Sequence, residues 1–267
     1  MLDSGLAGKT CLITGGSTGI GLGIARALAR EGVHLAVASR NPDSQAIAEL
    51  RKLSGRAIAI RADVSTEEGT VQMVHQAVEQ LGHLDLYVNN SAGTWHEPIT
   101  RITSEKYFRT MNTNLDACVF ACREAARHMI PRRSGSILIV NSTVRFCPSY
   151  GEAAYRISKM GLKMFMETVA IELAPYGIRV NLLTPGSFPT RMVAGIPPHI
   201  EAKLKTQIPL RRSGDPDECG PASVLLLSDR LSGYTTGSDI VIDGGLSLRP
   251  LSLWTDEEIL KMNSSED

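Results

Sequence analysis

The sequence has no excess of charge of either sign and no long apolar run, and both absences narrow the choice of partner. Lysine plus arginine and aspartate plus glutamate each total 28 of the 267 residues, so the formal net charge is zero. Because nucleic acids and anionic membranes bind basic faces, neither is expected as a partner. No apolar run approaches the ~18 residues of a membrane-spanning helix. A small molecule is therefore the expected ligand.

Cysteine is also scarce. The five cysteines are odd in number and irregularly spaced, so we expect reduced thiols in a cytoplasmic protein and no disulfide framework. The first residues also show no charged segment followed by an apolar one, as an export signal would. Cys118 and Cys122 stand four apart on a predicted helix and could ligate a metal, but no further His or Cys pair completes a site. We expect buried thiols and no metal.

No linker rich in proline, glycine or serine and no block of charge divides the chain, so residues 1–267 are expected to form one domain. Short β-branched runs alternate with helix-length segments, which predicts a parallel sheet with crossover helices. Most runs are continuously apolar, as expected when helices cover both faces of the sheet. The predicted fold is α/β, a single-domain, doubly wound parallel sheet of the Rossmann type with about seven strands. The predicted strands are 11–14, 33–39, 57–60, 84–89, 137–141, 179–183 and 239–242.

Helices are predicted at 19–30 and at 153–173. Another begins at the capping box 65–68 and continues to about residue 81. A long helix passes through Asn114 and Cys122 and ends before Pro131, and a last one begins at Asp215. Two stretches fall outside the alternation. Segment 187–214 contains four prolines and is predicted to be a substrate loop or lid with one short helix. The tail 246–267 could pack on a neighbouring subunit, although chain ends are more often disordered.

A glycine-rich turn, TGGSTGIG at 14–21, joins the first predicted strand to the first predicted helix. Glycine lets the backbone turn tightly and approach a pyrophosphate, and the helix N-terminus offers free N–H groups. Such a turn can also end a strand for structural reasons alone. Between a strand and a helix, it predicts a dinucleotide site.

The second predicted strand ends in Ser39-Arg40-Asn41, without the acidic residue that usually holds the ribose 2′-hydroxyl of NAD. An arginine can pair with a 2′-phosphate through a charge-assisted contact. This pattern favours NADP(H). If Arg40 is only a solvated loop residue, NAD(H) remains possible.

Tyr155 and Lys159 stand four apart on a predicted helix, so the phenol and the ammonium can share one face. Such a pair arises often by chance and is weak evidence alone. Ser142, thirteen positions before Tyr155, ends the fifth predicted strand. Doubly wound sheets place their sites at the carboxyl ends of strands, which strengthens the interpretation.

Together these segments identify a resemblance to the short-chain dehydrogenases/reductases, over residues 6–245. The chain is most similar to the branch with β-ketoacyl-carrier-protein reductases and polyol or sugar dehydrogenases. The matching segments are the glycine turn, 62–64 (Ala-Asp-Val), 89–93 (Asn-Asn-Ser-Ala-Gly), Asn114, Ser142, Tyr155, Lys159, 185–190, and Thr236-Gly237 leading to Asp243-Gly244-Gly245.

The resemblance implies a catalytic set of four residues. Tyr155 would be the proton donor or acceptor, and Ser142 would hydrogen-bond the substrate oxygen. Lys159 would hold the nicotinamide ribose and lower the pKa of the tyrosine. Asn114 would anchor a water that continues the proton path.

The resemblance also places the cofactor. Asp63 and Val64 would flank the adenine, Asn90 would lie near the adenosine ribose, and the segment from Pro185 to Thr190 would line the carboxamide. The expected cofactor-binding residues are Gly15, Ser17, Thr18, Gly19, Ile20, Gly21, Ser39, Arg40, Asn41, Asp63, Val64, Asn90, Ala92, Gly93, Tyr155, Lys159, Pro185, Gly186, Phe188 and Thr190.

The electrostatics agree with such a pair. A free tyrosine titrates near ~10, too high for an efficient base at neutral pH. A lysine charge about 4 Å away, at an effective dielectric constant near ~20, contributes about 4 kcal/mol and would lower the pKa by about three. Hydride transfer to a carbonyl would then be accompanied by proton transfer from Tyr155, with Ser142 stabilising the developing alkoxide.

Several positions depart from the family pattern or stay open. The segment 89–93 has one extra residue, Ser91, so either asparagine before it could face the cofactor. Arg145 could meet an acidic substrate, but we expect a surface arginine. Trp95 could stack on a substrate ring and His96 could act as an acid or base, although rim packing is the simpler interpretation.

The expected function is hydride transfer between NADP(H) and a ketone or secondary alcohol by a homotetramer or homodimer. An NAD-dependent sugar, polyol or hydroxysteroid dehydrogenase is the alternative if Arg40 is a spectator. A silent dinucleotide sensor or scaffold is a third possibility, and the complete catalytic set argues against it. The expected lining segments, 93–97, 143–151 and 187–213, are mixed in polarity and do not identify the substrate.

Overall fold

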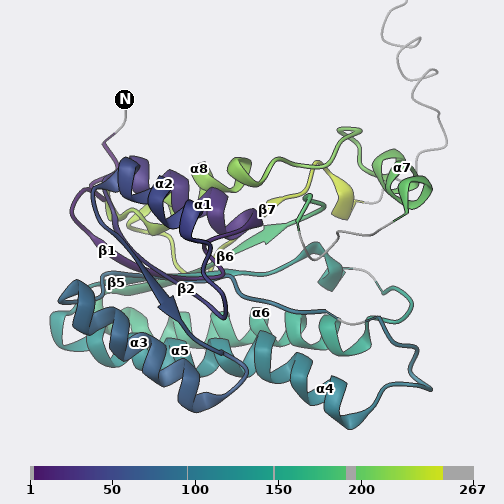
Figure 1. Cartoon of the computed structure of the whole chain (residues 1–267), viewed down its shortest axis with the longest axis horizontal. Coiled ribbons are helices and arrows are strands. Elements are labelled where there is room, and N and C mark those ends of the chain that lie inside the picture. The colour runs from purple at the N-terminus through teal and green to yellow at the C-terminus, as the bar shows by residue number, and fades with distance from the viewer. Residues whose placement is uncertain (1–2, 95, 147, 191–196, 249–267) are drawn as a thin grey trace, which may run out of the picture.

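The computed structural model describes residues 3–94, 96–146, 148–190 and 197–248. Seven strands form one sheet in the order β3-β2-β1-β4-β5-β6-β7, and every neighbouring pair is parallel. The strands are β1 Thr10–Thr14, β2 His34–Ser39, β3 Ala57–Arg61, β4 Leu86–Asn89, β5 Gly135–Val140, β6 Ile178–Pro185 and β7 Asp239–Ile242. The predicted doubly wound sheet is confirmed (Figure 1).

Helices cover both faces of this sheet. The helices are α1 Gly19–Arg30, α2 Ser44–Ser54, α3 Glu67–Leu81, α4 Ser104–Met111, α5 Ala117–Met129, α6 Ala153–Leu173, α7 Pro198–Gln207, α8 Cys219–Leu227 and α9 Asp229–Ser232. A π-helical segment, η1 Asn112–Asp116, joins α4 to α5. The described part of the chain also contains five short 3₁₀ segments: η2 Ile130–Arg132, η3 Thr143–Phe146, η4 Ala174–Tyr176, η5 Pro216–Glu218 and η6 Leu246–Leu248.

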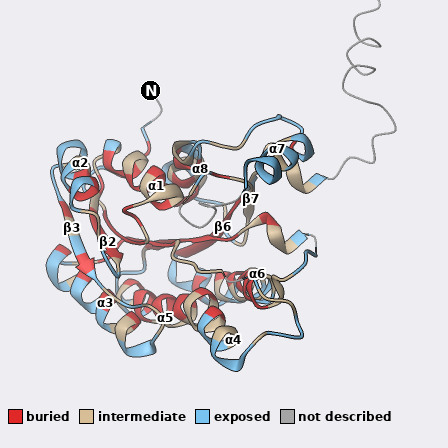
Figure 2. Ribbon diagram, turned by 45° about the vertical axis from the view of Figure 1, so that its right-hand side comes forward, coloured by how far each residue is buried: buried red, intermediate tan, exposed pale blue. Residues whose placement is uncertain are grey.

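Side chains of the strands β1 to β6 alternate between two apolar cores. Leu12 packs with residues of α3, α5 and α6, whereas Cys11 and Ile13 pack with residues of α1, α2 and α8. Figure 2 shows the buried strands between two helical layers whose outer faces are exposed. This arrangement explains why the strands are apolar on both faces, and it makes the sheet a rigid support for the loops at its ends.

Two helical segments of the structure differ from the prediction. Helix α2 was not among the expected elements; Asp43 caps it by accepting from the Gln45 backbone N–H at 2.9 Å. The single helix expected through Asn114 and Cys122 is interrupted by η1, where one extra residue per turn changes the direction of the side chains. Helix α5 ends at Met129, before Pro131, as predicted.

The strand order reverses its direction between β1 and β4. Strand β1 pairs with β2 on one side and with β4 on the other, so the connections diverge there. Open α/β sheets bind ligands in the crevice outside the carboxyl ends of such a pair. The loops after β1 and β4 are therefore the first place to look for a site.

The region 187–214 contains α7, the one short helix that was expected there. Residues 191–196 and the tail beyond Leu248 lie outside the described residues, so the assignment of a lid and the role of the tail stay predictions. None of the helices within the described residues has the length and apolar character needed to cross a membrane.

Candidate active site

The glycine turn after β1 leaves no room for a side chain at Gly21. Gly15 has a φ of +64° and donates its N–H to the Ala38 carbonyl at 2.7 Å. A Cβ atom at Gly21 would lie 2.2 Å from the Gly15 carbonyl oxygen, which is far closer than atoms can approach. Helix α1 begins at Gly19, so its free N–H groups face the crevice where β1 ends. The turn has the shape of a phosphate cradle.

The loop after β4 is fastened to this turn by Asn90. The backbone N–H groups of Asn90 and Ser91 donate to the Thr14 hydroxyl at 2.9 and 3.0 Å. The Asn90 side-chain amide donates to the carbonyls of Thr14 and Gly15 at 3.0 and 3.2 Å. Asn89 is buried and accepts from the Tyr87 hydroxyl at 2.9 Å. Of the two asparagines, Asn90 therefore lies against the glycine turn.

The end of β2 offers an unusual combination of polar groups. The Ser39 hydroxyl oxygen is shielded from solvent and has no hydrogen-bond partner among the described residues. The next residue, Arg40, is exposed, and Asn41 is exposed beside it. Hydrogen bonds from Ser65, helped by the charges of Arg40 and Arg109, lower the pKa of Asp63. An unpaired hydroxyl beside an accessible guanidinium fits a phosphorylated ribose, so these residues can hold a dinucleotide.

Ser142, Tyr155 and Lys159 meet at the carboxyl end of β5. Ser142 follows β5 after one residue, Asn141, and its hydroxyl lies near the phenol of Tyr155, in the first turn of α6, where it lowers the pKa of that phenol. The Lys159 ammonium lies 5.8 Å from the centre of the Tyr155 ring and donates to the Val140 carbonyl at 3.1 Å. Tyr155 and Lys159 are both buried. The structure thus brings together the three predicted catalytic residues.

The expected lowering of the tyrosine pKa is not what this structure shows. Burial raises the pKa of Tyr155, and the hydrogen bond from Ser142 only partly offsets that effect. Glu152 raises the pKa of the phenol further, and Arg156 lowers it. Burial also lowers the pKa of the Lys159 ammonium to about 8. The expectation was wrong because it weighed the charge of Lys159 and left out the desolvation of both groups.

Asn114 lies in η1, fully buried between two parts of the site. Its side-chain oxygen accepts from the Gly93 N–H at 2.8 Å, and its amide donates to the Gly93 carbonyl at 2.8 Å. The same amide donates to the Ser158 hydroxyl at 3.2 Å, and that hydroxyl donates to the Tyr155 carbonyl at 2.6 Å. Asn114 therefore connects the loop after β4 to the catalytic turn of α6. π-helical bulges often mark functional positions, and this one turns Asn114 inward.

Asn141, which was absent from the predicted site, contacts two of its residues. Its side-chain oxygen accepts from the Ser142 N–H at 2.9 Å, and its amide donates to the Lys159 carbonyl at 3.1 Å. One buried side chain thus fixes the backbone of two of the predicted catalytic residues. Its place next to Ser142 at a strand end was the only signal in the sequence.

The segment after β6 contacts both β7 and the glycine turn. Pro185 ends β6, and the Gly186 N–H donates to the Ile242 carbonyl at 2.8 Å. Thr190 comes back to the glycine turn, since a Cβ atom at Gly19 would lie 3.0 Å from its methyl group. Phe188 instead packs into the core formed with α1 and α8, so only its backbone can face the crevice.

The remaining expected cofactor residues lie in three places. Ala92 and Gly93 belong to the loop after β4, where Gly93 binds Asn114. Val64 and Ile20 pack partly against the two apolar cores. Three residues lie along the turn itself and its helix N-terminus: Ser17, Thr18 and Gly19.

The structure also corrects the expected position of Arg145. Arg145 is not at the surface: its side chain is 9% exposed and forms an ion pair with Asp239. His96 is exposed and lies 3.7 Å from the Glu152 carboxylate. Trp95 is outside the described residues, so its packing stays a prediction.

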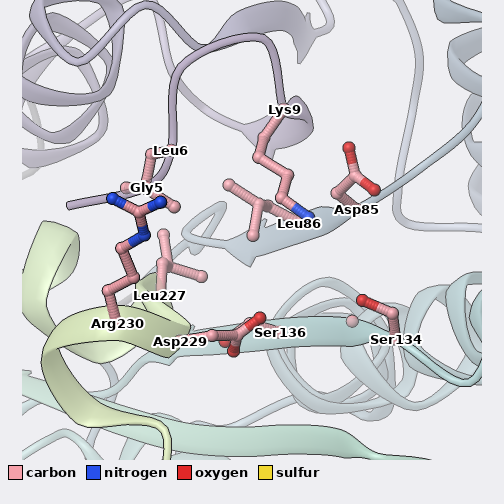
Figure 3. A pocket seen from close by; sticks show the side chains of 11 residues that line it. Gly5, Leu6, Lys9, Asp85, Leu86, Ser134, Ser136, Leu227, Asp229 and Arg230 are labelled. Carbon is pink, nitrogen blue, oxygen red and sulfur yellow. The ribbon is translucent and has the colours of Figure 1, made fainter. Parts of the chain in front are cut away.

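The recess in Figure 3 lies at the opposite edge of the sheet, where β1, β4 and β5 begin. Its acidic residues are already paired, Asp85 with Arg132 at 2.8 Å and Asp229 with Arg179 at 2.9 Å. These ion pairs link neighbouring segments of the fold, and the recess lies far from Ser142, Tyr155 and Lys159.

Within residues 3–94, 96–146, 148–190 and 197–248, no three His, Cys, Asp or Glu side chains are grouped so that they could hold a metal ion. Cys118 and Cys122 are buried, with their sulfur atoms 3.9 Å apart. Buried thiols were expected at both positions, and this is confirmed.

Comparison with known proteins agrees with this geometry. Residues 15–247 match the family model described as enoyl-(acyl carrier protein) reductase. The chain is 35% identical over 248 residues to a 3-oxoacyl-acyl-carrier-protein reductase of Chlamydia pneumoniae, covering 92% of this chain and all of that one. A short-chain type dehydrogenase/reductase from Mycobacterium marinum superposes with a TM-score of 0.85 at 34% identity, covering 90% of this chain and 96% of the other. The chain belongs to the short-chain dehydrogenase/reductase family.

A second relative shows how widely substrates vary among similar chains. The glucose 1-dehydrogenase 2 of Bacillus subtilis is 33% identical over 254 residues, covering 93% of this chain and 98% of the relative. Members of this family use NAD(H) or NADP(H), and this short-chain dehydrogenase/reductase is therefore an oxidoreductase acting on alcohol or carbonyl groups.

Proposed function

We propose that the protein interconverts a ketone and a secondary alcohol with NADP(H), and that Tyr155 is the general acid and base. The observation that carries this proposal is the buried meeting of Ser142, Tyr155 and Lys159 beside the glycine turn. A dinucleotide bound along that turn would place its nicotinamide next to these three side chains.

The proposed chemistry divides between cofactor and protein. When bound, the dinucleotide supplies a hydride to the carbonyl carbon, or accepts one from the alcohol carbon. Tyr155 donates its phenolic proton to the carbonyl oxygen as that oxygen gains negative charge, and it takes the proton back in the reverse direction. The Ser142 hydroxyl donates a hydrogen bond to the same oxygen. The raised pKa of Tyr155 keeps the phenol protonated at neutral pH, which is the form that carbonyl reduction uses.

The other two residues of the set act through binding and proton supply. Lys159 would hold the nicotinamide ribose with its ammonium, which already lies on the catalytic face of α6. Asn114 would anchor a water that returns a proton to Tyr155. The hydrogen bonds of Asn114 to Gly93 and Ser158 support this role, because they fix its amide between the loop after β4 and helix α6.

The preference for NADP(H) rests on the end of β2. Ser39 and Arg40 offer an unpaired hydroxyl and an exposed guanidinium, and no acidic residue stands at 39–41. A 2′-phosphate would satisfy both groups. Titration of the purified protein with NADPH and with NADH tests this preference without any substrate. Tighter NADPH binding is expected, and tighter NADH binding would contradict it.

We further propose that the chain assembles as a homotetramer or homodimer in the cytoplasm. Helix α6 exposes an apolar stripe on the face away from the core: Ile157, Met160, Met164 and Ile171. Contiguous exposed apolar side chains of this size commonly mark protein interfaces. Light scattering at several protein concentrations would show the mass of a dimer or tetramer, and a monomer at all concentrations would contradict the assembly.

The catalytic proposal is tested by turnover. Wild type and Ser142→Ala would be assayed with NADPH on ethyl acetoacetate and on a cyclic ketone, and with NADP⁺ on glucose and a hydroxysteroid. At least one substrate is expected to react, with Ser142→Ala slowed about 100-fold or more. Equal turnover by the two proteins would overturn the proposed role of Ser142.

A further inference from the structure

The turn that follows Ser142 controls where its hydroxyl points. In η3 the Val144 N–H donates to the Ser142 hydroxyl oxygen at 3.4 Å, and the Arg145 N–H donates to the Ser142 carbonyl at 3.4 Å. Any shift of η3 therefore moves the hydroxyl that meets Tyr155. Short turns of this kind have little stiffness of their own, so something outside η3 has to hold it in place.

One anchor comes from α6. The guanidinium of Arg156, the residue after Tyr155, donates to the Val144 carbonyl. It also pairs with Glu152, with nitrogen–oxygen distances of 3.1 and 2.6 Å. This contact ties η3 to the same helical turn that carries the phenol.

The other anchor comes from the far side of the sheet. Arg145 pairs with Asp239, the first residue of β7, and their side chains are only 9% and 13% exposed. The second oxygen of Asp239 accepts from the Thr184 hydroxyl at 2.5 Å, and Thr184 is fully buried in β6. The guanidinium also lies 4.0 Å from the centre of the Phe146 ring. The carboxylate is thus fixed by β6 and in turn fixes η3.

This cluster is a poor means of gaining stability. The free energy needed to remove two charges from water offsets most of their mutual attraction. Apolar residues of similar size can therefore often replace such a pair without a loss of stability. The Arg145 Nε–H is shielded from solvent and finds no acceptor among the described residues, which adds a further cost. Buried ion pairs of this kind are better explained by the single conformation that they specify.

We propose that Arg145 and Asp239 are positioning residues that fix η3 and so aim the Ser142 hydroxyl at the substrate oxygen. This inference rests on the proposed function of Ser142. A misplacement of a catalytic group by about 1 Å can cost about 100-fold in rate. Loosening η3 should therefore lower kcat, whereas the glycine turn and the end of β2, which would bind the dinucleotide, stay as they are.

The test compares two double variants that each remove the ion pair of one buried arginine. Arg145→Met with Asp239→Asn removes the proposed anchor without leaving a charge unpaired. Arg179→Met with Asp229→Asn is the control, because the side chain of Arg179 is also 9% exposed but lies near the amino end of β6, at the other end of the strands from Ser142. Each is assayed for kcat, for NADPH binding, and for amide hydrogen exchange at Val144 and Arg145.

In the Arg145/Asp239 double variant we expect kcat to fall about tenfold or more, NADPH binding to stay within about twofold, and the two amides to exchange faster. The control should keep both kcat and the slow exchange. Arg145→Lys, which retains the charge, should recover part of kcat. An unchanged kcat in the first double variant would overturn the proposal, whatever its exchange, and so would unchanged exchange in that variant or an equal loss of kcat in the control.

The exchange measurement needs no substrate, so it also serves if turnover is slow. If the double variant fails to fold, Asp239→Asn alone is measured in the same way, because its carboxamide keeps the size and the acceptor for Thr184. Ser142→Ala and Tyr155→Phe are included in the same assay. Their full activity would refute the proposed function, whereas their inactivity beside a fully active Arg145/Asp239 variant would refute only the positioning role.

Discussion

Lys159 is a cationic residue in an almost fully buried position, with only 3% of its surface exposed. Burial lowers the pKa of its ammonium from 10.5 to about 8. Since one pKa unit corresponds to about 1.4 kcal/mol, keeping this charge in the folded protein costs about 3 kcal/mol below pH 8. Replacing Lys159 removes this cost, but it also removes the hydrogen bond to the Val140 carbonyl, which stabilises the wild type by about 1 kcal/mol. Lys159→Met should therefore stabilise the fold by about 2 kcal/mol at pH 7 while it abolishes turnover.

The sign of the pH dependence follows from proton linkage. Between the folded pKa of about 8 and the unfolded value of 10.5, the unfolded chain binds more protons at Lys159 than the folded protein does. The free energy of unfolding of the wild type should therefore rise with pH across this window, relative to that of Lys159→Met. The advantage of the variant should shrink by about 3 kcal/mol between pH 7 and pH ~10.5.

The assay is urea unfolding of both proteins, in parallel, at several pH values across this window. Groups that titrate identically in the two proteins cancel in the difference. A Lys159→Met protein that is less stable than wild type at pH 7, or a difference that stays constant from pH 8 to ~10.5, would refute the reasoning. Continued turnover by the variant would refute the role of the ammonium in binding.

Three further substitutions test other parts of the site. Gly21→Ala places a Cβ atom 2.2 Å from the Gly15 carbonyl oxygen. It should therefore destabilise the fold by about 1–3 kcal/mol in thermal unfolding and weaken NADPH binding at least about tenfold in titration. Unaltered binding would show that the glycine turn does not hold the cofactor phosphates. Arg40→Ser should weaken NADPH binding about tenfold or more and leave NADH binding unchanged, and equal effects on both would remove the argument for a 2′-phosphate. Asn141→Ala removes the hydrogen bonds to Ser142 and Lys159. Unfolding experiments should show a loss of about 1–3 kcal/mol in stability, and turnover assays should show a lower kcat. A fall in stability with an unchanged kcat would make Asn141 merely structural.

Most of the fold could be predicted because local signals agree with the tertiary structure. Helices α1 and α6 and strand β7 have the predicted bounds, since apolar periodicity and end signals act within a few residues. Helix α2 was missed because only Ala46, Ile47 and Leu50 of its short polar sequence are buried. The π-helical segment η1 has no local signature, because one extra residue in a turn leaves the apolar pattern almost unchanged.

The site shows a similar division. Ser142, Tyr155 and Lys159 could be found because strand ends and helical spacing bring them together. The position of Arg145 could not, because its partner Asp239 is far along the chain and only the tertiary fold makes them neighbours. The pKa of Tyr155 also depends on burial, which spacing along a helix does not reveal.

Turnover by Tyr155→Phe, measured together with NADPH binding, tests the central claim most directly. This substitution removes one hydroxyl from a buried side chain and leaves the ring in place. We expect turnover of a ketone substrate to fall at least about 100-fold, with the Kd for NADPH within about twofold of wild type. A variant that binds NADPH and reduces the ketone at the wild-type rate would contradict the account, because no other described side chain has been assigned the proton.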